Sequence, residues 1–529
     1  MTDMVYLKEH TKIEPLNGRW YAWSHLVSPV QHAFNVAFRH MPSFRSFISN
    51  ASVHEAAAKN PKMLGSAFME LGKSDMPAVQ KLMEDTLEQH GHLIRFAEDV
   101  VQLDRKLAAE TGHSLDRVYD ELAPSLQGLV ELSYDTNNRH TLRLIEELAR
   151  HGALDTVETQ EIAFTHTRDE DRNFFLNTPR VDNEKRMIVK IPLSDPRIDL
   201  LGRARIAPVD FEELVAAFGI ADADRERFRG YFTDRAPVRN APEYDGDGVR
   251  VRYFGHACVL LQTRDVSVMI DPFLTWDDDY EDENHLCFND LPDRIDYVFL
   301  THNHQDHFSP ELLLQLRRRI GKILVPRNNV NSVADPSIAL ALRILGFDNV
   351  EAMDWMETIP LPDGALTALP FYGEHADLSI ASKHGMHLRL KDRSFLFLAD
   401  SDCKDRNLYR RIVGLLGKVD TLFIGMECDG APLTWLYGTY LSNPINRRDD
   451  NSRKLSGSDA HRAMAIVEEV GCREVYVYAM GQEPWMRYVT GLEYTPKSKQ
   501  IVESDKLLRH CDELGLRAER LRGCRTLQG

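Results

Sequence analysis

Several features that would assign this chain to other protein classes are missing from the sequence. The seven cysteines are odd in number and form no Cys-x-x-Cys pair, so we expect reduced thiols rather than a disulfide framework. No apolar run approaches the roughly 18 residues of a membrane span, and residues 1–18 lack the apolar core of a signal peptide. These absences predict a cytoplasmic protein with no membrane partner.

Positive charge is also scarce. Lysine and arginine together number 64 against 81 aspartates and glutamates, which gives a formal net charge of −17. A general nucleic-acid binder needs the opposite balance, so we exclude a nucleic-acid partner. The sequence also has no Gly-x-Gly-x-x-Gly turn for a dinucleotide, so any redox activity would need an external electron donor.

The length of 529 residues predicts two or three domains. A stretch rich in Pro, Gly, Asn and Asp at 237–248 suggests a boundary between residues 1–240 and 247–529. Apolar residues at helical spacing from residue 76, and again over 115–132 and 142–148, predict a largely helical α+β N-terminal domain, in which we place no metal. In the second half, expected strands at 249–262 and 266–271 and a helix at 312–319 indicate an α/β sandwich with its site at the strand ends.

The strongest signal is Thr-His-Asn-His-Gln-Asp-His at residues 301–307, directly after a short apolar run typical of a buried strand. It brings His302, His304, Asp306 and His307 close together. Polar side chains this close together compete for hydration unless a bound cation coordinates them. Imidazole together with carboxylate suits zinc or iron better than calcium or magnesium. A solvated polar loop is the alternative, but the density of ligand types favours a metal site.

The residues around this loop resemble the metallo-β-lactamase fold, an αββα sandwich. The resemblance covers roughly residues 247–500 and includes Gly-His-Ala at 255–257, Ile-Asp-Pro at 270–272 and Ala-Asp-Ser at 399–401. It implies that Asp400 bridges two metals. His256 and Asp271 could be purely structural, or groups that orient a ligand imidazole.

The sequence departs from that fold's usual ligand set at two places. The fold normally supplies a histidine directly after a glycine, whereas here Gly373 is followed by Glu374, with His375 next. A late strand normally supplies another histidine, and none lies near Met480. Exchanging imidazole for carboxylate favours iron that must reach higher oxidation states over a zinc-bound water. His375 stays open as an alternative ligand to Glu374.

With this glutamate and an N-terminal domain of this size, the chain resembles the non-haem diiron β-hydroxylases known from chloramphenicol biosynthesis. The resemblance implies an O2-dependent monooxygenase that hydroxylates the β-carbon of an aminoacyl group tethered to a nonribosomal peptide synthetase carrier domain. An external reductase and a homodimer built through the N-terminal part are also implied. Two irons would be held by His302, His304 and Glu374 on one side and by Asp306 and His307 on the other, with Asp400 between them.

Glu427 follows an expected strand in Gly-Met-Glu-Cys. With Glu374 and Asp400 it completes the expected catalytic acids, either as a group that shifts when substrate binds or as a solvated loop acid. Three segments are candidates for substrate or carrier contacts: the basic run 317–319 with Lys322, the acidic run 277–283, and residues 483–485 with Tyr488. The basic run could equally be a solvated face.

Two other functions are compatible with parts of this pattern. A dizinc hydrolase of thioesters or phosphodiesters would use the same histidine loop to generate hydroxide, but the missing late histidine argues against it. A non-catalytic scaffold that binds carrier domains would require a degenerate site, whereas six ligand types are intact.

Overall fold

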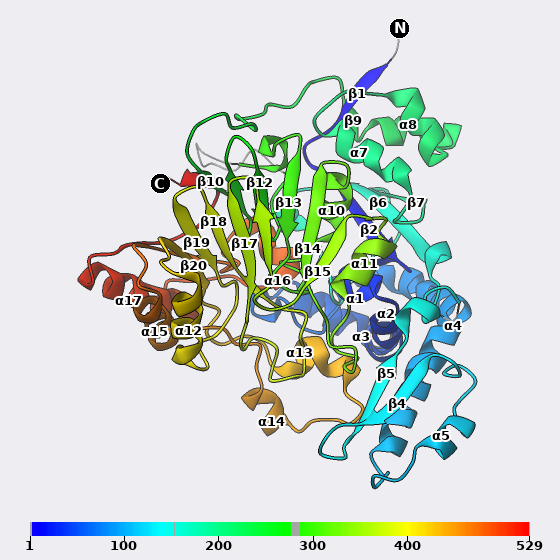
Figure 1. Cartoon of the computed structure of the whole chain (residues 1–529). Helices are drawn as coiled ribbons and strands as arrows, with labels where there is room; N and C mark the ends of the chain where they lie inside the picture. Colours follow the sequence, from blue (N-terminus) through cyan, green and yellow to red (C-terminus); the bar gives the residue numbers. More distant parts are fainter. Residues whose placement is uncertain (1–2, 153, 277–285, 528–529) are drawn as a thin grey trace.

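The computed structural model describes residues 3–152, 154–276 and 286–527. Figure 1 shows two facing sheets at the centre, with the N-terminal third of the chain packed along one side. The acidic run 277–283 lies outside the described residues. Within them, no helix is both long and apolar enough to cross a membrane.

The second half of the chain forms two seven-stranded sheets. The first has the order β15-β14-β13-β12-β11-β10-β23 and the second β16-β17-β18-β19-β20-β21-β22. Neighbours β12 to β15 pair in parallel, as do β19 to β22, so the carboxyl ends of these strands meet at one edge of each sheet. The strands are β10 (Arg250–Tyr253), β11 (Val259–Gln262), β12 (Ser267–Ile270), β13 (Ile295–Phe299), β14 (Ile320–Pro326), β15 (Val350–Met353), β16 (Thr358–Leu361), β17 (Gly364–Leu369), β18 (Gly385–Leu390), β19 (Arg393–Phe397), β20 (Thr421–Gly425), β21 (Glu474–Tyr478), β22 (Arg517–Arg520) and β23 (Arg525–Leu527).

Helices cover the outer faces of both sheets. One apolar core, which includes Val268 and Phe397, fills the space between the sheets, and another joins the second sheet to its helices. The covering helices are α10 (Pro310–Leu316) and α11 (Ile338–Ile344) on the first sheet, and α12 (Arg406–Leu416), α15 (Ala460–Val470) and α17 (Lys499–Glu513) on the second. This is the expected αββα sandwich.

The N-terminal part contains both helices and strands. A four-stranded sheet, β3-β2-β6-β7, packs with two long helices, and a further sheet has the order β8-β1-β9. The short strands of these sheets are β1 (Met4–Leu7), β3 (Trp20–Tyr21), β7 (Arg186–Lys190), β8 (Val209–Asp210) and β9 (Phe232–Thr233). The main elements are β2 (Thr11–Asn17), β6 (Gln160–His166), α3 (Met41–Ala58), α4 (Met76–Leu107) and α7 (Asp199–Ala204). Its core is continuous with α10 and α11, so the N-terminal part is docked directly on the helices that cover the first sheet.

The helices expected over 115–132 and 142–148 are largely wrong. Within the expected ranges the longest helix is α5 (Asp116–Asp120). The strand β4 (Val130–Tyr134) pairs with β5 (His140–Leu144) in a hairpin. The Asp135 side chain accepts hydrogen bonds from two backbone N–H groups of the turn, and Asn138 has a positive φ of 56°. This turn chemistry competes with helix formation and explains the error.

The strand expected over 249–262 is also interrupted. It divides into β10 and β11 around a tight turn, in which Gly255 and His256 have φ angles of 104° and 49°. The turn directs His256 toward the histidine loop, a placement that a continuous strand would not allow.

Candidate metal centre

The histidine loop leaves β13 and leads into α10. The Ser309 hydroxyl accepts a hydrogen bond from Leu312 N–H and caps α10, and proline occupies its first position. Asp271, at the end of β12, anchors the start of the loop: its carboxylate accepts hydrogen bonds from the Thr301 N–H (2.7 Å) and hydroxyl (2.6 Å). The loop is thus fixed before it reaches its ligand-type side chains.

Each imidazole of the loop has one nitrogen that faces a group able to accept its N–H. Nδ1 of His307 lies 2.8 Å from Asp271 Oδ2, and Nδ1 of His302 lies 3.0 Å from the Thr301 hydroxyl oxygen. Nε2 of His304 lies 2.8 Å from the Tyr437 hydroxyl, on α13 (Leu433–Tyr437). These partners leave Nε2 of His302 and His307 and Nδ1 of His304 with lone pairs directed inward, as metal ligation requires.

Two carboxylates from the second sheet complete the inner surface. Glu374, in the loop after β17, places Oε1 2.6 Å from Nδ1 of His304. Asp400, after β19, places Oδ2 3.2 Å from Nε2 of His307 and 3.7 Å from Nε2 of His302. Asp400 therefore lies between the two sides of the histidine loop.

The donor atoms cluster as a metal pair would need. Ligand atoms of His302, His304 and Glu374 lie within 4.8 Å of one another, as do those of His302, His307 and Asp400. Nε2 of His302, Nε2 of His307 and Oδ1 of Asp400 are buried without a hydrogen-bond partner in the described part of the chain. Buried polar atoms without partners are costly, so their convergence fits bound cations, and the imidazole and carboxylate set suits iron.

The structure separates Glu374 from its neighbour His375. Glu374 belongs to two of the ligand clusters, whereas His375 belongs to none. Nδ1 of His375 instead lies 2.7 Å from Glu374 Oε2, and burial lowers the pKa of His375 to about 4. A neutral imidazole that hydrogen-bonds the carboxylate is suited to orienting Glu374.

Glu427, after β20, is close to the other carboxylates. Its oxygen lies within 4.8 Å of ligand atoms of Glu374 and Asp400, which rules out a solvated loop acid. Burial, followed by repulsion from Asp400 and Glu374, raises the pKa of Glu427 well above its ordinary value. This environment favours the protonated form of the Glu427 carboxyl group.

The backbone at the site is strained. His256, Asp271, Glu374 and Ala399 all have positive φ angles, at 49°, 39°, 66° and 46°. Each such non-glycine residue costs on the order of 1–3 kcal/mol and persists only where the surroundings impose it. The strand ends thus hold Glu374 and residues that adjoin or support the other ligands in conformations they would not adopt alone.

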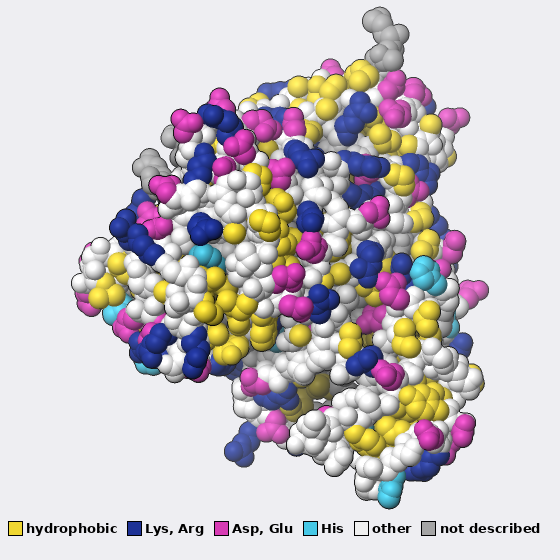
Figure 2. All heavy atoms as spheres, in the orientation of Figure 1, with side chains coloured by type: hydrophobic (Ala, Val, Ile, Leu, Met, Phe, Trp, Pro, Cys, Tyr) yellow, Lys and Arg dark blue, Asp and Glu magenta, His cyan; other side chains and the backbone are white. Residues whose placement is uncertain are grey.

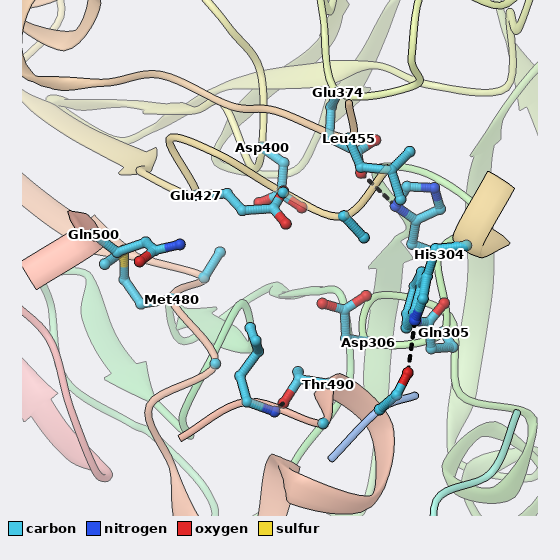
Figure 3. Close-up of a pocket in the computed structure, with 18 of the residues that line it drawn as sticks. His304, Gln305, Asp306, Glu374, Asp400, Glu427, Leu455, Met480, Thr490 and Gln500 are labelled. Atoms are coloured by element: carbon cyan, nitrogen blue, oxygen red, sulfur yellow. Dashed lines mark hydrogen bonds and ion pairs between the residues drawn. The ribbon is translucent and has the colours of Figure 1, made fainter. Parts of the chain in front are cut away.

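A cavity of about 320 Å³ opens beside these side chains. Figure 3 shows the carboxylates of Asp306, Asp400 and Glu427 facing it, with Met480 and Gln500 on the far side. Both parts of the chain contribute to its wall. Leu64 and Gly65 come from the N-terminal part, and Trp435, Leu492 and Tyr494 from the second half.

Two of the three arginines of the basic run are buried, so only Arg318 and Lys322 could contribute to a docking face. The Arg317 guanidinium is buried and donates to Leu345 O (2.7 Å) and Asp199 (2.7 Å), and Arg319 donates to Leu291 O (2.7 Å). Arg318 pairs with Asp199, and Lys322 with Glu351. The run instead joins α10 to its surroundings.

The entrance expected at 483–485 and Tyr488 is also wrong. Glu483, Trp485 and Tyr488 are buried, and the Arg172 guanidinium packs over the Tyr488 ring at 3.8 Å. The nearby residues that do line the cavity are Met480, Gly481 and residues 490–492.

Comparison with known proteins agrees with this architecture. Residues 6–237 match the family model described as the diiron non-heme β-hydroxylase N-terminal domain, and residues 250–363 match a β-lactamase superfamily domain. The chain is 36% identical over 529 residues, 99% of each chain, to a 4-amino-L-phenylalanyl-[CmlP-peptidyl-carrier-protein] 3-hydroxylase of Streptomyces venezuelae. The chain belongs to the diiron non-heme β-hydroxylase family.

The solved structures lead to the same family. This β-hydroxylase matches the crystal structure of CmlA, a diiron β-hydroxylase from S. venezuelae, with a TM-score of 0.93 and 35% identity over the whole of both chains. A mutant of CmlA gives a TM-score of 0.91 over 99% of this chain and 100% of the other. The enzyme is therefore an oxidoreductase whose cofactor is a pair of iron ions, and the dizinc hydrolase is not favoured.

Proposed function

We propose that this β-hydroxylase acts on an aminoacyl group held as a thioester on a carrier domain of a nonribosomal peptide synthetase. One oxygen atom of O2 enters the β C–H bond, and the other leaves as water. Two electrons and two protons balance the reaction, and the electrons come from an external reductase. The full-length similarity to an enzyme named for a carrier-bound aminoacyl substrate carries this proposal.

In this proposal His302, His304 and Glu374 hold one iron and Asp306 and His307 hold the other, with Asp400 between them. Bound there, the iron pair supplies the reductive cleavage of O2. Asp271 and Tyr437 fix the imidazole orientations from outside, and His375 orients Glu374. The ionised carboxylates compensate the cationic charge of the metals.

Glu427 is placed to handle a proton at the edge of the cavity. Because the Glu427 carboxyl group lies beside Asp400 and its surroundings favour the protonated form, it can donate a proton to an oxygen atom or to a substrate group that enters between them. The apolar part of the wall, which includes the buried Leu455 and the partly buried Trp435, can limit the access of water to the reacting carbon. A cavity of about 320 Å³ is within the usual size range for small-molecule sites and suits an aminoacyl group.

The domain assignments are part of the proposal. Residues 1–240 act in docking and dimerisation and hold no metal, and residues 247–529 form the catalytic domain. None of the possible metal-ligand clusters among the described residues contains a cysteine, which an iron–sulfur centre would require. This supports an external electron donor. We also propose a cytoplasmic location.

A homodimer through the N-terminal part is supported by an apolar surface. Figure 2 shows apolar side chains gathered over the β4–β5 hairpin, and Ile145 and Leu148, directly after it, are 38% and 58% exposed. Leu148→Glu should convert a dimer to a monomer in size-exclusion chromatography with light scattering. A monomeric wild-type chain would contradict this part of the proposal.

The activity is tested with a carrier domain loaded with aromatic aminoacyl groups, a reductant and 18O-labelled O2. Mass spectrometry should find one labelled oxygen on the still-tethered acyl group. Asp400→Ala should lose this product and should bind less iron. Release of the free, unmodified amino acid would instead indicate a thioesterase and refute the proposal.

A further inference from the structure

A further buried histidine, His256, faces the same group of side chains from the turn between β10 and β11. Its Nε2 lies 3.3 Å from Oδ2 of Asp306, and its ring centroid is 5.0 Å from that of His307. Together the three residues form a ligand-type cluster with atoms within 4.8 Å. By proximity alone, His256 would be counted as a third ligand of the iron at Asp306 and His307.

Its other ring nitrogen decides against ligation. The Gly481 N–H donates a hydrogen bond to Nδ1 of His256 at 3.1 Å. A neutral imidazole has one lone pair and one N–H, so an accepting Nδ1 requires the proton on Nε2. Nε2 then has no lone pair for a metal, and its N–H faces the Asp306 carboxylate across a 3.3 Å contact, although like Nε2 of His302 and His307 it has no hydrogen-bond partner among the described residues.

The contrast with the histidine loop is chemical. The remote nitrogens of His302, His304 and His307 face a hydroxyl or a carboxylate, groups that can accept an N–H. A backbone N–H cannot accept, so the remote nitrogen of His256 is held as an acceptor. Three imidazoles are thus arranged as ligands and one as a donor.

The late strand builds this arrangement. Residues 479–483, after β21, hold the His256 turn from the outside: Ala479 N–H donates to His256 O (2.8 Å), and Glu483 Oε1 accepts from His256 N–H (3.0 Å). Gly255 is required here, because a Cβ at this position would lie 2.5 Å from Trp485. The segment that commonly carries the last histidine of this fold therefore supplies a backbone N–H that orients His256.

The geometry points to His256 as a positioning residue that donates its Nε2–H to Asp306 and does not bind iron. Held in this way, Asp306 has one oxygen engaged by His256 and the other free for the metal. Only three imidazoles then serve the iron pair.

Electron–nuclear double resonance on the half-reduced wild-type enzyme counts the ligating nitrogens directly. Three strongly coupled imidazole nitrogens are expected, from His302, His304 and His307. A fourth would overturn the inference. This measurement needs no substitution, so it does not depend on whether a variant folds.

The positioning role is tested separately with His256→Gln. This variant should keep three coupled nitrogens while retaining its iron about 10–100-fold less tightly in a chelator competition, as expected for loss of a group that supports a ligand. His387→Gln, at another buried histidine that bonds only Ser394 Oγ (2.8 Å) in the described structure, is the matched control and should bind iron normally. Unchanged iron retention in His256→Gln would overturn the role.

The inference rests on Asp306 being an iron ligand, and Asp306→Asn distinguishes the two failures. Loss of iron in that variant with normal retention in His256→Gln would refute only the role of His256. Normal iron binding in Asp306→Asn would refute the ligand assignment itself, and with it the role given to His256.

Discussion

At the scale of single residues, the pair Glu374 and His375 distinguishes an oxygen-rich site from a nitrogen-rich one. Glu374→Gln removes a charged ligand, so we expect the iron content to fall from two towards about one per chain. His375→Gln keeps a hydrogen-bond donor beside Glu374 and should retain both irons, with a modest loss of affinity. Inductively coupled plasma mass spectrometry measures both contents. The reverse ranking would make His375 the ligand.

Glu146 is a half-buried residue with one buried carboxyl oxygen, far from the metal centre in sequence, and its protonation should control stability. Burial raises its pKa from 4.5 to about 7. The folded state therefore binds more protons than the unfolded state between these values, and stability falls as pH rises through this range. Above pH 7, Glu146→Gln should be more stable than the wild type by on the order of 2 kcal/mol.

The difference should vanish below about pH 4.5, because both states of the wild type are then protonated at Glu146. Urea unfolding at pH 5 and pH 8 measures it. Glu158→Gln, at an exposed position, serves as the control and should show no such pH dependence. A Glu146→Gln variant that is equally stabilised at both pH values would contradict the assignment.

At the scale of elements, the contact between α7 and α10 depends on one glycine. A Cβ at Gly202 would lie 2.1 Å from Gln315 O, on the helix that follows the histidine loop. Gly202→Ala should lower the free energy of unfolding by about 1–3 kcal/mol or more, since the two backbones must separate. Gly414→Ala, at an exposed position of α12 with no atom within 4 Å of the added Cβ, should raise the free energy of unfolding by about 0.5–1 kcal/mol. Similar losses in both variants would argue against the close contact.

Site features that lie within one segment could be predicted from the sequence, whereas contacts between distant elements could not. The histidine loop could be recognised because its ligand-type residues are adjacent in sequence, and the glycine and aspartate patterns at Glu374 and Asp400 are local as well. For His256 the sequence left a structural and an orienting role open, and its tautomer could not be predicted because it depends on Gly481, which lies 225 residues away. The Tyr437 contact to His304 carries no sequence signal for the same reason.

At the scale of the whole molecule, a buried charge cluster joins the two parts of the chain. Arg172 donates to Glu14 (2.9 Å), within its own part, and to Glu311 (2.5 Å), in the first turn of α10. Glu14 keeps a second partner in Arg180, whereas no other cation pairs with Glu311 among the described residues. Losing Arg172 would therefore leave Glu311 as a buried, uncompensated charge.

Arg172→Met should accordingly destabilise the enzyme by about 3–5 kcal/mol, measured by chemical denaturation. Adding Glu311→Gln should recover much of this loss, because the amide is uncharged and can still accept a hydrogen bond from the Tyr21 hydroxyl. Additive losses in the double variant would show that the two charges do not interact.

The cavity wall has a consequence for engineering. Leu64 and Gly65 line the cavity together with Gly491 and Leu492. The two segments are so close that a Cβ added at Gly491 would lie 2.5 Å from the Gly65 backbone. The acyl groups that the cavity can accept are therefore determined jointly by segments that are distant in the sequence. Chimaeras that exchange catalytic halves between homologues would inherit mismatched rims even when every iron ligand is retained. Altering selectivity therefore calls for libraries that vary both loops together.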